Sequence, residues 1–374
     1  MPIGIVVGLI VGVIAYIIGR FLGSSSIAIG GLIGAITGSI SVALIRNSES
    51  RRSRASINQL LLAALLSGCA AISAKAQSTV FVSAKNGIDG GICSSAAPCR
   101  TVNFALTQAP NGGQVLIVDS GDYDESITIT KDITIAAAPG VAAVFNATGA
   151  ANTVFIFNYP ASFCTSAGEC RILTLRNLIF DGQNLAQDAA HAAGIKLIAE
   201  NCTFTRFKYG VYVVGGGTYQ FKNCVFYSLE TGVYLAPTTN GAVVRSQTNA
   251  VIEDCRFSAL SSAGIDVFTG PLGFNTLRVV ARYSLFNRAG AAIRSSASTG
   301  GSIQVDIERC EITNSSFGVA SAFTGSVARV SNSTIVGNLT GLSAGSGGSL
   351  LSRSNNTIEA NSTNGTFTGL FVAK

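Results

Sequence analysis

The feature that most constrains the fold is a short repeat in the second half of the chain. Its copies, aligned on one position, are spaced by 22 to 31 residues and start at Cys202, Cys224, Cys255, Tyr283, Cys310, Ser333 and Asn356, with Asn177 as an earlier copy. An apolar side chain follows two residues later, at Phe204, Phe226, Phe257, Leu285, Ile312, Ile335 and Ile358. A period in the twenties, built of short alternating segments and Gly/Asn/Ser turns, predicts a solenoid.

The alternation within one copy predicts which side chains face the core. In YGVYV, Val211 and Val213 should point inward and Tyr212 outward, because successive strand residues face opposite sides. Stacking of parallel coils would bring Phe204, Phe226 and Phe257 into one aromatic stack. The glycines after the apolar position are predicted to occupy corners that need positive φ: Gly210, Gly232, Gly264, Gly318 and Gly341. Residues 101–109 are expected to cap one open end, and residues 365–374 to close the other.

The motifs resemble those of a known superfamily. GQVLIVDSGDYDESITITKDITIAAAPG, followed by the N-x-x-F/I and N/Y-x-GV repeats, resembles the right-handed parallel β-helix of pectin-lyase-like proteins over about residues 79–374. PCRTVNFAL is similar to the opening of bacterial exported β-helix proteins of unassigned function. The resemblance implies an all-β, right-handed parallel β-helix solenoid. It implies no single activity, because the superfamily includes lyases, hydrolases, esterases, adhesins and tailspikes.

The first 76 residues carry the signals for membrane insertion and export. Two apolar stretches within residues 1–45 are each long enough to span a bilayer, and they carry glycines at four-residue spacing, which predicts a transmembrane helical hairpin. Residues 46–76 combine a basic linker with a signal-like apolar run. Cleavage could follow Ala76, or Cys69 could be lipidated as in a lipobox. A fusion or an incorrect start codon is the alternative for residues 1–45.

The charge distribution agrees with this organisation. Residues 1–76 contain six of the 25 Lys/Arg but one of the 19 Asp/Glu, so almost all of the net charge of +6 lies there. The excess of basic over acidic residues therefore indicates membrane topology rather than a nucleic-acid-binding surface. The interpretation is a domain of residues 77–374 exposed in the periplasm or outside a bacterial cell, with residues 1–45 in the inner membrane or removed.

Cysteine spacing predicts two local disulfides and a ladder of free thiols. Two pairs each close a tiny loop in a domain assigned to an oxidising compartment, Cys93 with Cys99 and Cys164 with Cys170. A metal half-site is the alternative, but further ligands at suitable spacing are missing. The repeat cysteines are expected to be buried free thiols, because parallel Cβ vectors hold their sulfurs poorly for a disulfide: Cys202, Cys224, Cys255 and Cys310.

One acidic segment is a weak candidate for Ca²⁺ binding. DSGDYDE holds four carboxylates within seven residues, at Asp119, Asp122, Asp124 and Glu125. The same segment resembles the ordinary first turn of a β-helix, so a structural role is the favoured interpretation. No other cofactor is predicted.

The strongest functional prediction is a row of outward side chains on successive coils. The position after G-V reads Lys196, Tyr212, Tyr234, Asp266, Arg294, Ala320 and Ser343. Tyrosines between charged groups on a flat face suit a sugar chain, with sugar rings on the aromatic faces and hydroxyls or carboxylates on Asp and Arg. A second row alternates in charge and predicts ion pairs between coils: Arg176, Glu200, Lys222 and Glu253.

Insertions after the same strand should build a rim beside the first row. They would bring four polar side chains near it: Asp188, His191, Arg245 and Gln247. His191, the one histidine of the chain, is interpreted as a loop residue at a corner. A chain with one histidine has few of the residues that a serine–histidine pair or a zinc site requires.

Three functions remain open from the sequence. The first is a non-catalytic, envelope-displayed protein that binds polysaccharide or a cell-surface glycan. The second is a polysaccharide lyase or glycoside hydrolase, favoured if Asp254, Asp266 and Arg294 converge in a groove, with His191 as a further candidate. The third is an adhesin-like spacer, favoured if the tyrosine face is flat and free of loops.

Overall fold

The computed structural model describes residues 78–147, 153–156, 171–237, 247–270 and 276–372. The predicted membrane hairpin, the signal-like segment with Cys69, the pair Cys164 and Cys170, and Arg245 lie outside these ranges. No helix in the described ranges is long and apolar enough to cross a membrane.

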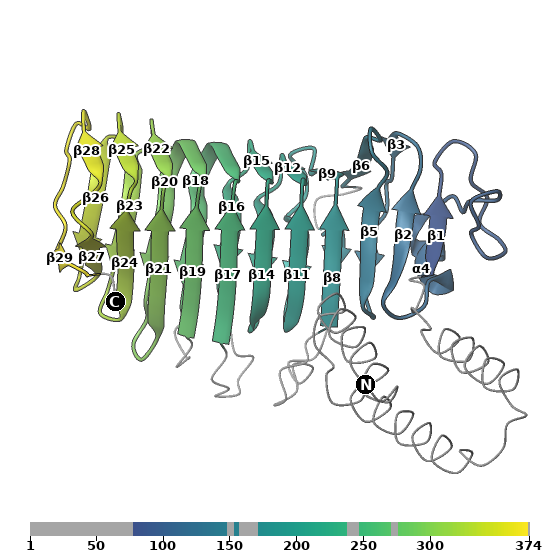
Figure 1. Ribbon diagram of the computed structural model, residues 1–374, viewed down its shortest axis with the longest axis horizontal. Coiled ribbons are helices and arrows are strands. Elements are labelled where there is room, and N and C mark those ends of the chain that lie inside the picture. Colours follow the sequence, from purple (N-terminus) through teal and green to yellow (C-terminus); the bar gives the residue numbers. More distant parts are fainter. Residues whose placement is uncertain (1–77, 148–152, 157–170, 238–246, 271–275, 373–374) are drawn as a thin grey trace, which may run out of the picture. The chain divides into compact units, whose positions relative to one another are not determined.

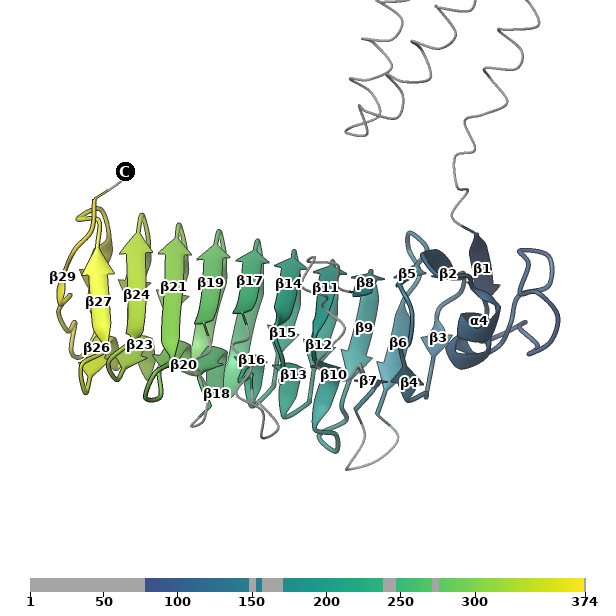
Figure 2. The same cartoon turned by 90° about the horizontal axis from the view of Figure 1, so that it is seen from below.

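The described residues form a parallel β-helix of two large sheets and one short helix, α4 (Val102–Gln108). The first sheet stands in one row in Figure 1, and Figure 2 shows the second beside it. The first comprises β1 (Thr79–Val82), β2 (Gly113–Ile117), β5 (Ile133–Ala137), β8 (Arg171–Arg176), β11 (Ile195–Glu200), β14 (Gly217–Lys222), β17 (Gln247–Glu253), β19 (Thr276–Arg282), β21 (Ser302–Glu308), β24 (Ser326–Ser331), β27 (Ser349–Ser352) and β29 (Gly369–Leu370).

The second sheet folds around the rest of each coil. Its strands are β3 (Gly121–Asp122), β4 (Ile127–Thr128), β6 (Ala143–Asn146), β7 (Phe155–Ile156), β9 (Leu178–Asp181), β10 (Asp188–Ala192), β12 (Thr203–Thr205), β13 (Tyr209–Val213), β15 (Val225–Tyr227), β16 (Thr231–Leu235), β18 (Arg256–Phe268), β20 (Leu285–Ser296), β22 (Glu311–Thr313), β23 (Phe317–Ala322), β25 (Thr334–Val336), β26 (Thr340–Gly345) and β28 (Thr357–Glu359). The pairings between coils are parallel, as the solenoid prediction requires.

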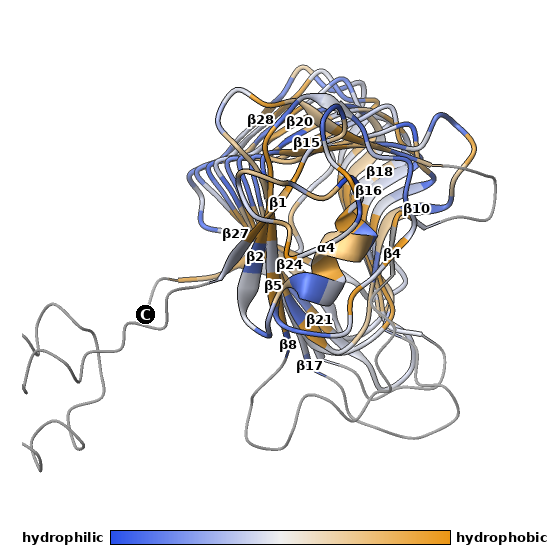
Figure 3. Cartoon of the chain, turned by 90° about the vertical axis from the view of Figure 1, so that its right-hand side faces the viewer, coloured by the Kyte–Doolittle hydropathy of each residue, from blue (hydrophilic) through white to orange (hydrophobic). Residues whose placement is uncertain are grey.

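The core is a continuous stack of side chains along the solenoid axis. The predicted stack of Phe204, Phe226 and Phe257 is confirmed, with ring centroids 4.9 and 4.6 Å apart. Phe145 and Phe180 extend it at one end and Phe286 at the other. Viewed along the axis in Figure 3, apolar colour lines the inside of the coils. Rings at this spacing exclude water from both faces, so the stack stabilises every pair of neighbouring coils.

Two turns of each coil use left-handed backbone, and the glycines expected there lie elsewhere. The turn after the first-sheet strand has positive φ at Asn177, Asn201, Asn223, Asp254, Tyr283, Arg309 and Asn332. Gly210 instead lies inside β13 without positive φ, so the corner prediction for it and its equivalents is wrong. Glycine is needed there for close packing, because a Cβ would lie 2.6 Å from the carbonyl oxygen of Gly232 and 2.9 Å from Phe226.

The register also corrects the sequence alignment at two copies. Cys255 is followed by Arg256, which pairs with Leu285, so its equivalent in the next coil is Ser284 rather than Tyr283. Phe286, not Leu285, therefore continues the stack. Similarly, Leu178 rather than Asn177 is the equivalent of Cys202. Tyr283 and Asn177 occupy the left-handed turn instead, one residue earlier.

The repeat cysteines form the predicted ladder of buried free thiols. Cys202, Cys224, Cys255 and Cys310 are all buried and unbridged. Each thiol donates to a nearby backbone carbonyl, for example Cys255 Sγ to Glu253 O at 3.2 Å. Burial raises the pKa of the Cys310 thiol to about 12, which keeps it protonated and unreactive at neutral pH.

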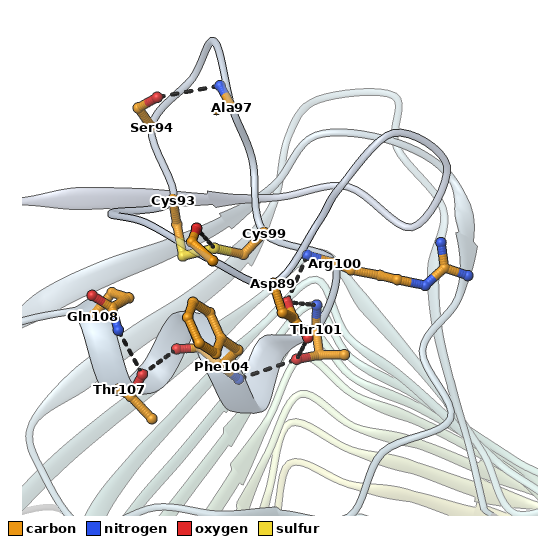
Figure 4. The surroundings of a disulfide bond; sticks show 11 residues. Asp89, Cys93, Ser94, Ala97, Cys99, Arg100, Thr101, Phe104, Thr107 and Gln108 are labelled. Carbon is orange, nitrogen blue, oxygen red and sulfur yellow. Dashed lines mark hydrogen bonds between the residues drawn. A yellow bond between two sulfur atoms is a disulfide. The ribbon is translucent and has the colours of Figure 1, made fainter.

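The two ends of the solenoid are closed as predicted. Thr101 caps the N-terminus of α4, and Lys131 Nζ donates to the carbonyls of Leu106 and Ala109 at its other end. The predicted disulfide Cys93–Cys99 is confirmed and fixes the loop above α4 (Figure 4). At the far end, Phe367 packs against the core and β29 pairs with β27.

The stack predicts a sharp contrast between two aromatic positions. Phe257→Ala should lower the free energy of unfolding by about 3–5 kcal/mol, because it leaves a cavity between two stacked rings. Tyr227→Ala, at a side chain that is 52% exposed, should change it by less than about 0.5 kcal/mol. Chemical denaturation of both variants measures the difference. Equal effects would contradict the stack as the source of stability.

Candidate functional site

A histidine takes the place of the predicted lysine in the outward row on the second sheet. Strand register places His191 beside Tyr212, Tyr212 beside Tyr234, Tyr234 beside Asp266, and Asp266 beside Arg294. Ala320 and Ser343 continue the line. We call the five residues His191, Tyr212, Tyr234, Asp266 and Arg294 the tyrosine row.

Lys196 lies on the other sheet, which corrects its predicted place in the row. It belongs to β11, where its neighbours are Ile172 and Thr218. The error has a physical cause in Gly194, which resembles the glycines inside strands but has φ of 64° and lies in the turn after β10. The residues after it therefore start the next first-sheet strand.

His191 is not a loop residue as predicted, because it lies within β10 and is held by a buried carboxylate. Its Nδ1 lies 2.9 Å from Asp188 Oδ2, and Asp188 is 3% exposed. The other oxygen of Asp188, Oδ1, has no hydrogen-bond partner in the described part of the chain. A carboxylate at Nδ1 favours the tautomer that carries its proton there, which leaves Nε2 as an acceptor. The imidazole edge meets the Tyr212 ring, with centroids 5.0 Å apart at 80°.

Tyr209 packs against the tyrosine row, although the sequence does not predict this contact. Its ring lies 5.2 Å from that of Tyr212 and 5.0 Å from that of Tyr234. Simple alternation would separate residues three apart onto opposite faces. The alternation breaks at Gly210 and Val211, two consecutive buried residues, so Tyr209 is partly exposed like Tyr212. The sequence feature that could have indicated this position of Tyr209 is the Y-G-V-Y spacing. Lys208 Nζ lies 5.2 Å from the Tyr209 ring, so a cation lies beside the three tyrosine rings.

The tyrosines stack on one another, which changes how a sugar would meet them. Tyr212 and Tyr234 are nearly parallel, at 22° and 5.3 Å, and Tyr209 covers Tyr234 at 17°. Much of the ring face is therefore occupied by neighbouring rings. The outer ends of the half-buried side chains, with their edges and hydroxyls, form the available surface. A ligand would be held by hydrogen bonds to the phenols more than by stacking on ring faces.

The surroundings keep these phenols neutral. Burial, followed by the nearby Asp266 carboxylate, raises the pKa of Tyr234 to about 12. Burial and the neighbouring Tyr209 and Asp188 raise the pKa of Tyr212 as well. Both hydroxyls are thus hydrogen-bond donors at neutral pH.

Asp266 and Arg294 form a two-pronged ion pair at the other end of the row. Arg294 Nε donates to Asp266 Oδ1 at 3.0 Å, and Nη2 contacts Oδ2 of the same carboxylate. Nη2 also reaches Ser262 Oγ at 3.3 Å. Asp266 is 7% exposed, whereas the Arg294 side chain is 43% exposed. The arginine therefore presents its open edge to a ligand, and Asp266 fixes its orientation.

Asp254 does not meet the condition set for an enzyme, which was convergence with Asp266 and Arg294 in a groove. Asp254 is exposed in the left-handed turn after β17, in a different row from Asp266. Gln247 is the first residue of β17, on the first sheet, and hydrogen-bonds Asn249.

The alternating row of charges on the first sheet is supported by contacts between Arg176 and Glu200 at 2.7 Å and between Arg282 and Glu253 at 3.2 Å.

The acidic segment at the start of the domain is engaged in structural contacts. Asp119 accepts hydrogen bonds from Ser83 Oγ, two backbone amides and Tyr123 Oη. Burial acts to raise its pKa, but these donors outweigh burial and lower it. Glu125 accepts from the first amides of α4, and Asp124 from Asn146. Asp122 is exposed in β3. Within the described ranges, no three or more His, Cys, Asp or Glu side chains are grouped to hold a metal ion.

Comparison with known families identifies the class of protein. The family model described as "Right handed beta helix region" matches residues 147–299 and, in a second overlapping match, residues 190–362, together more than half of the 374 residues. The chain therefore belongs to the right-handed β-helix family. A comparison with curated protein sequences finds no match.

Solved structures with a similar fold include three enzymes. Pectate lyase Pel9A is 18% identical, with 79% of this chain and 78% of that chain covered and a TM-score of 0.46. A rhamnogalacturonan lyase is 14% identical, with 70% and 76% covered and a TM-score of 0.42. The A-module of mannuronan C-5 epimerase AlgE4 from Azotobacter vinelandii is 14% identical, with 70% and 91% covered and a TM-score of 0.37.

The raised pKa of Tyr234 predicts how stability changes in alkali. The folded value of about 12 lies above the ordinary value of 10.0, so the neutral phenol contributes stability up to about pH 10. That contribution should be lost as the pH rises toward 12. Ultraviolet titration of the native protein should show late tyrosinate formation, and Tyr234→Phe should remove one late-titrating group. Removal of a group that titrates near pH 10 would contradict the assigned surroundings.

Proposed function

We propose that the tyrosine row is a polysaccharide-binding face. The observation that carries this proposal is one line of side chains, supplied by consecutive coils, with half-buried phenol donors beside an oriented arginine. Tyr212 and Tyr234 repeat with centroids 5.3 Å apart, a spacing comparable with the length of one pyranose unit. A polymer lying along the solenoid axis could therefore place two successive sugar units on Tyr212 and Tyr234.

The chemistry of the row fits hydroxyl- and carboxylate-bearing sugars. Neutral Tyr hydroxyls donate to sugar oxygens, His191 Nε2 accepts from a hydroxyl, and the open edge of Arg294 can pair with a uronate carboxylate. Rigid strands hold these groups, so little conformational entropy is lost on binding.

A double substitution tests the face. Tyr212→Ala with Tyr234→Ala should weaken binding of the full-length protein to its preferred polymer by at least about tenfold, because two hydrogen-bonding anchors are lost. Tyr227→Ala, at an exposed tyrosine outside the row, is the matched control and should bind normally. Retention on a glycan array and titration with uronate-containing and neutral polymers measure this. Unchanged retention of the double variant would refute the proposed face.

A second candidate function is a polysaccharide lyase, favoured by the Asp188–His191–Tyr212 arrangement. Asp188 orients His191, whose Nε2 could take the proton from the carbon next to a uronate carboxylate. Arg294 lies four strands along the row from His191, so it would bind the carboxylate of a different uronate unit of the same polymer. The electron pair then forms the carbon–carbon double bond as the glycosidic C–O bond breaks. Tyr212 would donate its proton to the leaving oxygen.

The lyase proposal has its own readout. The full-length protein incubated with uronate polymers should release products with an unsaturated end, detected by ultraviolet absorbance. His191→Ala should abolish their release while polymer binding persists. The assay is run with Ca²⁺ and with a chelator, because calcium dependence remains open. Binding without any such product, under both conditions, would reject this candidate and leave the binding face intact.

We also propose that the domain is displayed at a bacterial cell envelope, anchored through residues 1–45 or released after export. Support comes from the apolar stretches and arginine distribution of the sequence and from the Cys93–Cys99 disulfide. An adhesin-like spacer is less favoured, because the row combines charged and aromatic groups. Fractionation of cells that express the full chain, with protease protection, tests the location.

A further inference from the structure

A polar groove lies next to the tyrosine row, at the corner where the chain turns into strands β10, β13 and β16. It has a volume of about 470 Å³, within the range of small-ligand sites. Successive coils line it with residues 184–187, 206–208 and 228–230, joined by Ala259 and Ser261. Lys208 belongs both to this groove and to the border of the Tyr209 ring, so the groove and the face are contiguous.

The groove combines an apolar floor with a polar rim. Phe207, Leu229 and Ala186 are buried at 4, 4 and 6% exposure and form its base. Leu185, 54% exposed, adds an apolar lip. Gln187, Lys208 and Glu230 supply side-chain donors and acceptors around it. This pattern suits a pyranose, whose C–H groups contact apolar surface while its hydroxyls need hydrogen bonds.

Side chains, rather than backbone, are available for a ligand. The backbone amides of Lys208 and Glu230 are used between coils, bonded to Ala186 O and Phe207 O at 3.2 Å each. Arg206 is tied to Asp181, with Nε 2.8 Å from Oδ1 and a second contact between Nη2 and Oδ2. In the described ranges, the exposed side chains of Lys208 and Glu230 form no ion pair. They remain as one cationic donor and one anionic acceptor.

A second cavity on the same corner provides an internal comparison. It has a similar volume, about 440 Å³, but no charged side chain lines it. Its buried polar groups serve the fold, because Ser315 Oγ donates to Thr313 O and Asn338 Nδ2 donates to Ile312 O. The groove beside the tyrosine row therefore differs by carrying polar ends that the fold does not use.

We propose that this groove binds one neutral hexopyranose unit, a side branch of the polysaccharide held by the tyrosine row. The proposal rests on the proposed binding face, because a branch presupposes a main chain beside it. Opposite charges at Lys208 and Glu230 favour a neutral unit. With one charge of each sign, the groove has no net attraction for a charged sugar, whereas the hydroxyls of a neutral unit can accept from Lys208 and donate to Glu230.

Saturation-transfer NMR tests the groove independently of the face. The probes are the methyl glycosides of glucose, galactose and mannose, together with glucuronate. The full-length Tyr212→Ala/Tyr234→Ala variant silences the face, and at least one neutral glycoside should still receive saturation. Adding Lys208→Ala and Glu230→Ala should reduce that signal about tenfold, because two charge-assisted hydrogen bonds are lost. Adding Lys222→Ala and Glu253→Ala, an adjacent pair of opposite charges on the first sheet, should leave it unchanged.

Each outcome separates the groove from the face. A signal in wild type that disappears in the face-silenced variant overturns the groove and leaves the face standing. A signal that survives loss of Lys208 and Glu230 also overturns the groove. Glucuronate binding as strongly as the neutral glycosides overturns the neutral assignment. Absence of any signal in wild type, combined with no polymer retention, refutes both proposals.

Discussion

Parallel pairing in register is the interaction on which the rest of the structure depends. Each backbone ladder places a residue of one coil directly beside its equivalent in the next, as with Phe226 beside Phe257 and Tyr212 beside Tyr234. The neighbours of a side chain along the ladder are therefore mainly the residues at the same position in the adjacent coils. Inside the solenoid, this produces the phenylalanine stack and the thiol ladder. Outside, the same register produces the alternating charges of the first sheet and the tyrosine row of the second.

The register also explains how a surface row becomes a candidate site. Strands fix the spacing and direction of the phenols, and Asp266 and Asp188 orient Arg294 and His191 from buried positions. Such support holds the polar groups in place before a ligand arrives, which lowers the cost of binding. The corner groove adds depth beside a row that is otherwise open. A face and an adjoining groove together suit a branched ligand better than a single compact one.

Much of the fold could be predicted from the sequence because a period of twenty to thirty residues determines it directly. The solenoid, the phenylalanine stack, the Cys93–Cys99 disulfide, the buried free thiols and the α4 cap follow from spacing and polarity. Spacing does not reveal local backbone conformation. Spacing alone therefore predicts a left-handed turn at Gly210, although this residue lies in a strand where neighbouring coils leave no room for a Cβ.

The site was harder to predict because a small backbone irregularity moves a side chain to another face. The break in alternation at Gly210 and Val211 brings Tyr209 to the tyrosine row, and the turn at Gly194 places Lys196 on the other sheet. His191 lies in a coil whose sequence, DAAHA, carries none of the repeat motif, so only the ladder beside Tyr212 reveals its place. The roles of these residues can therefore be inferred from their contacts in the structure, but not from a sequence pattern.

The most direct measurement of the central claim is a crystal structure of the full-length protein bound to an oligosaccharide of the polymer it retains best. We expect a sugar chain running along the solenoid axis across β10, β13, β16, β18 and β20, with Tyr212, Tyr234 and Arg294 in hydrogen-bond contact with it. A sugar chain bound on the first sheet, or across the strands without contact to the tyrosine row, would contradict it.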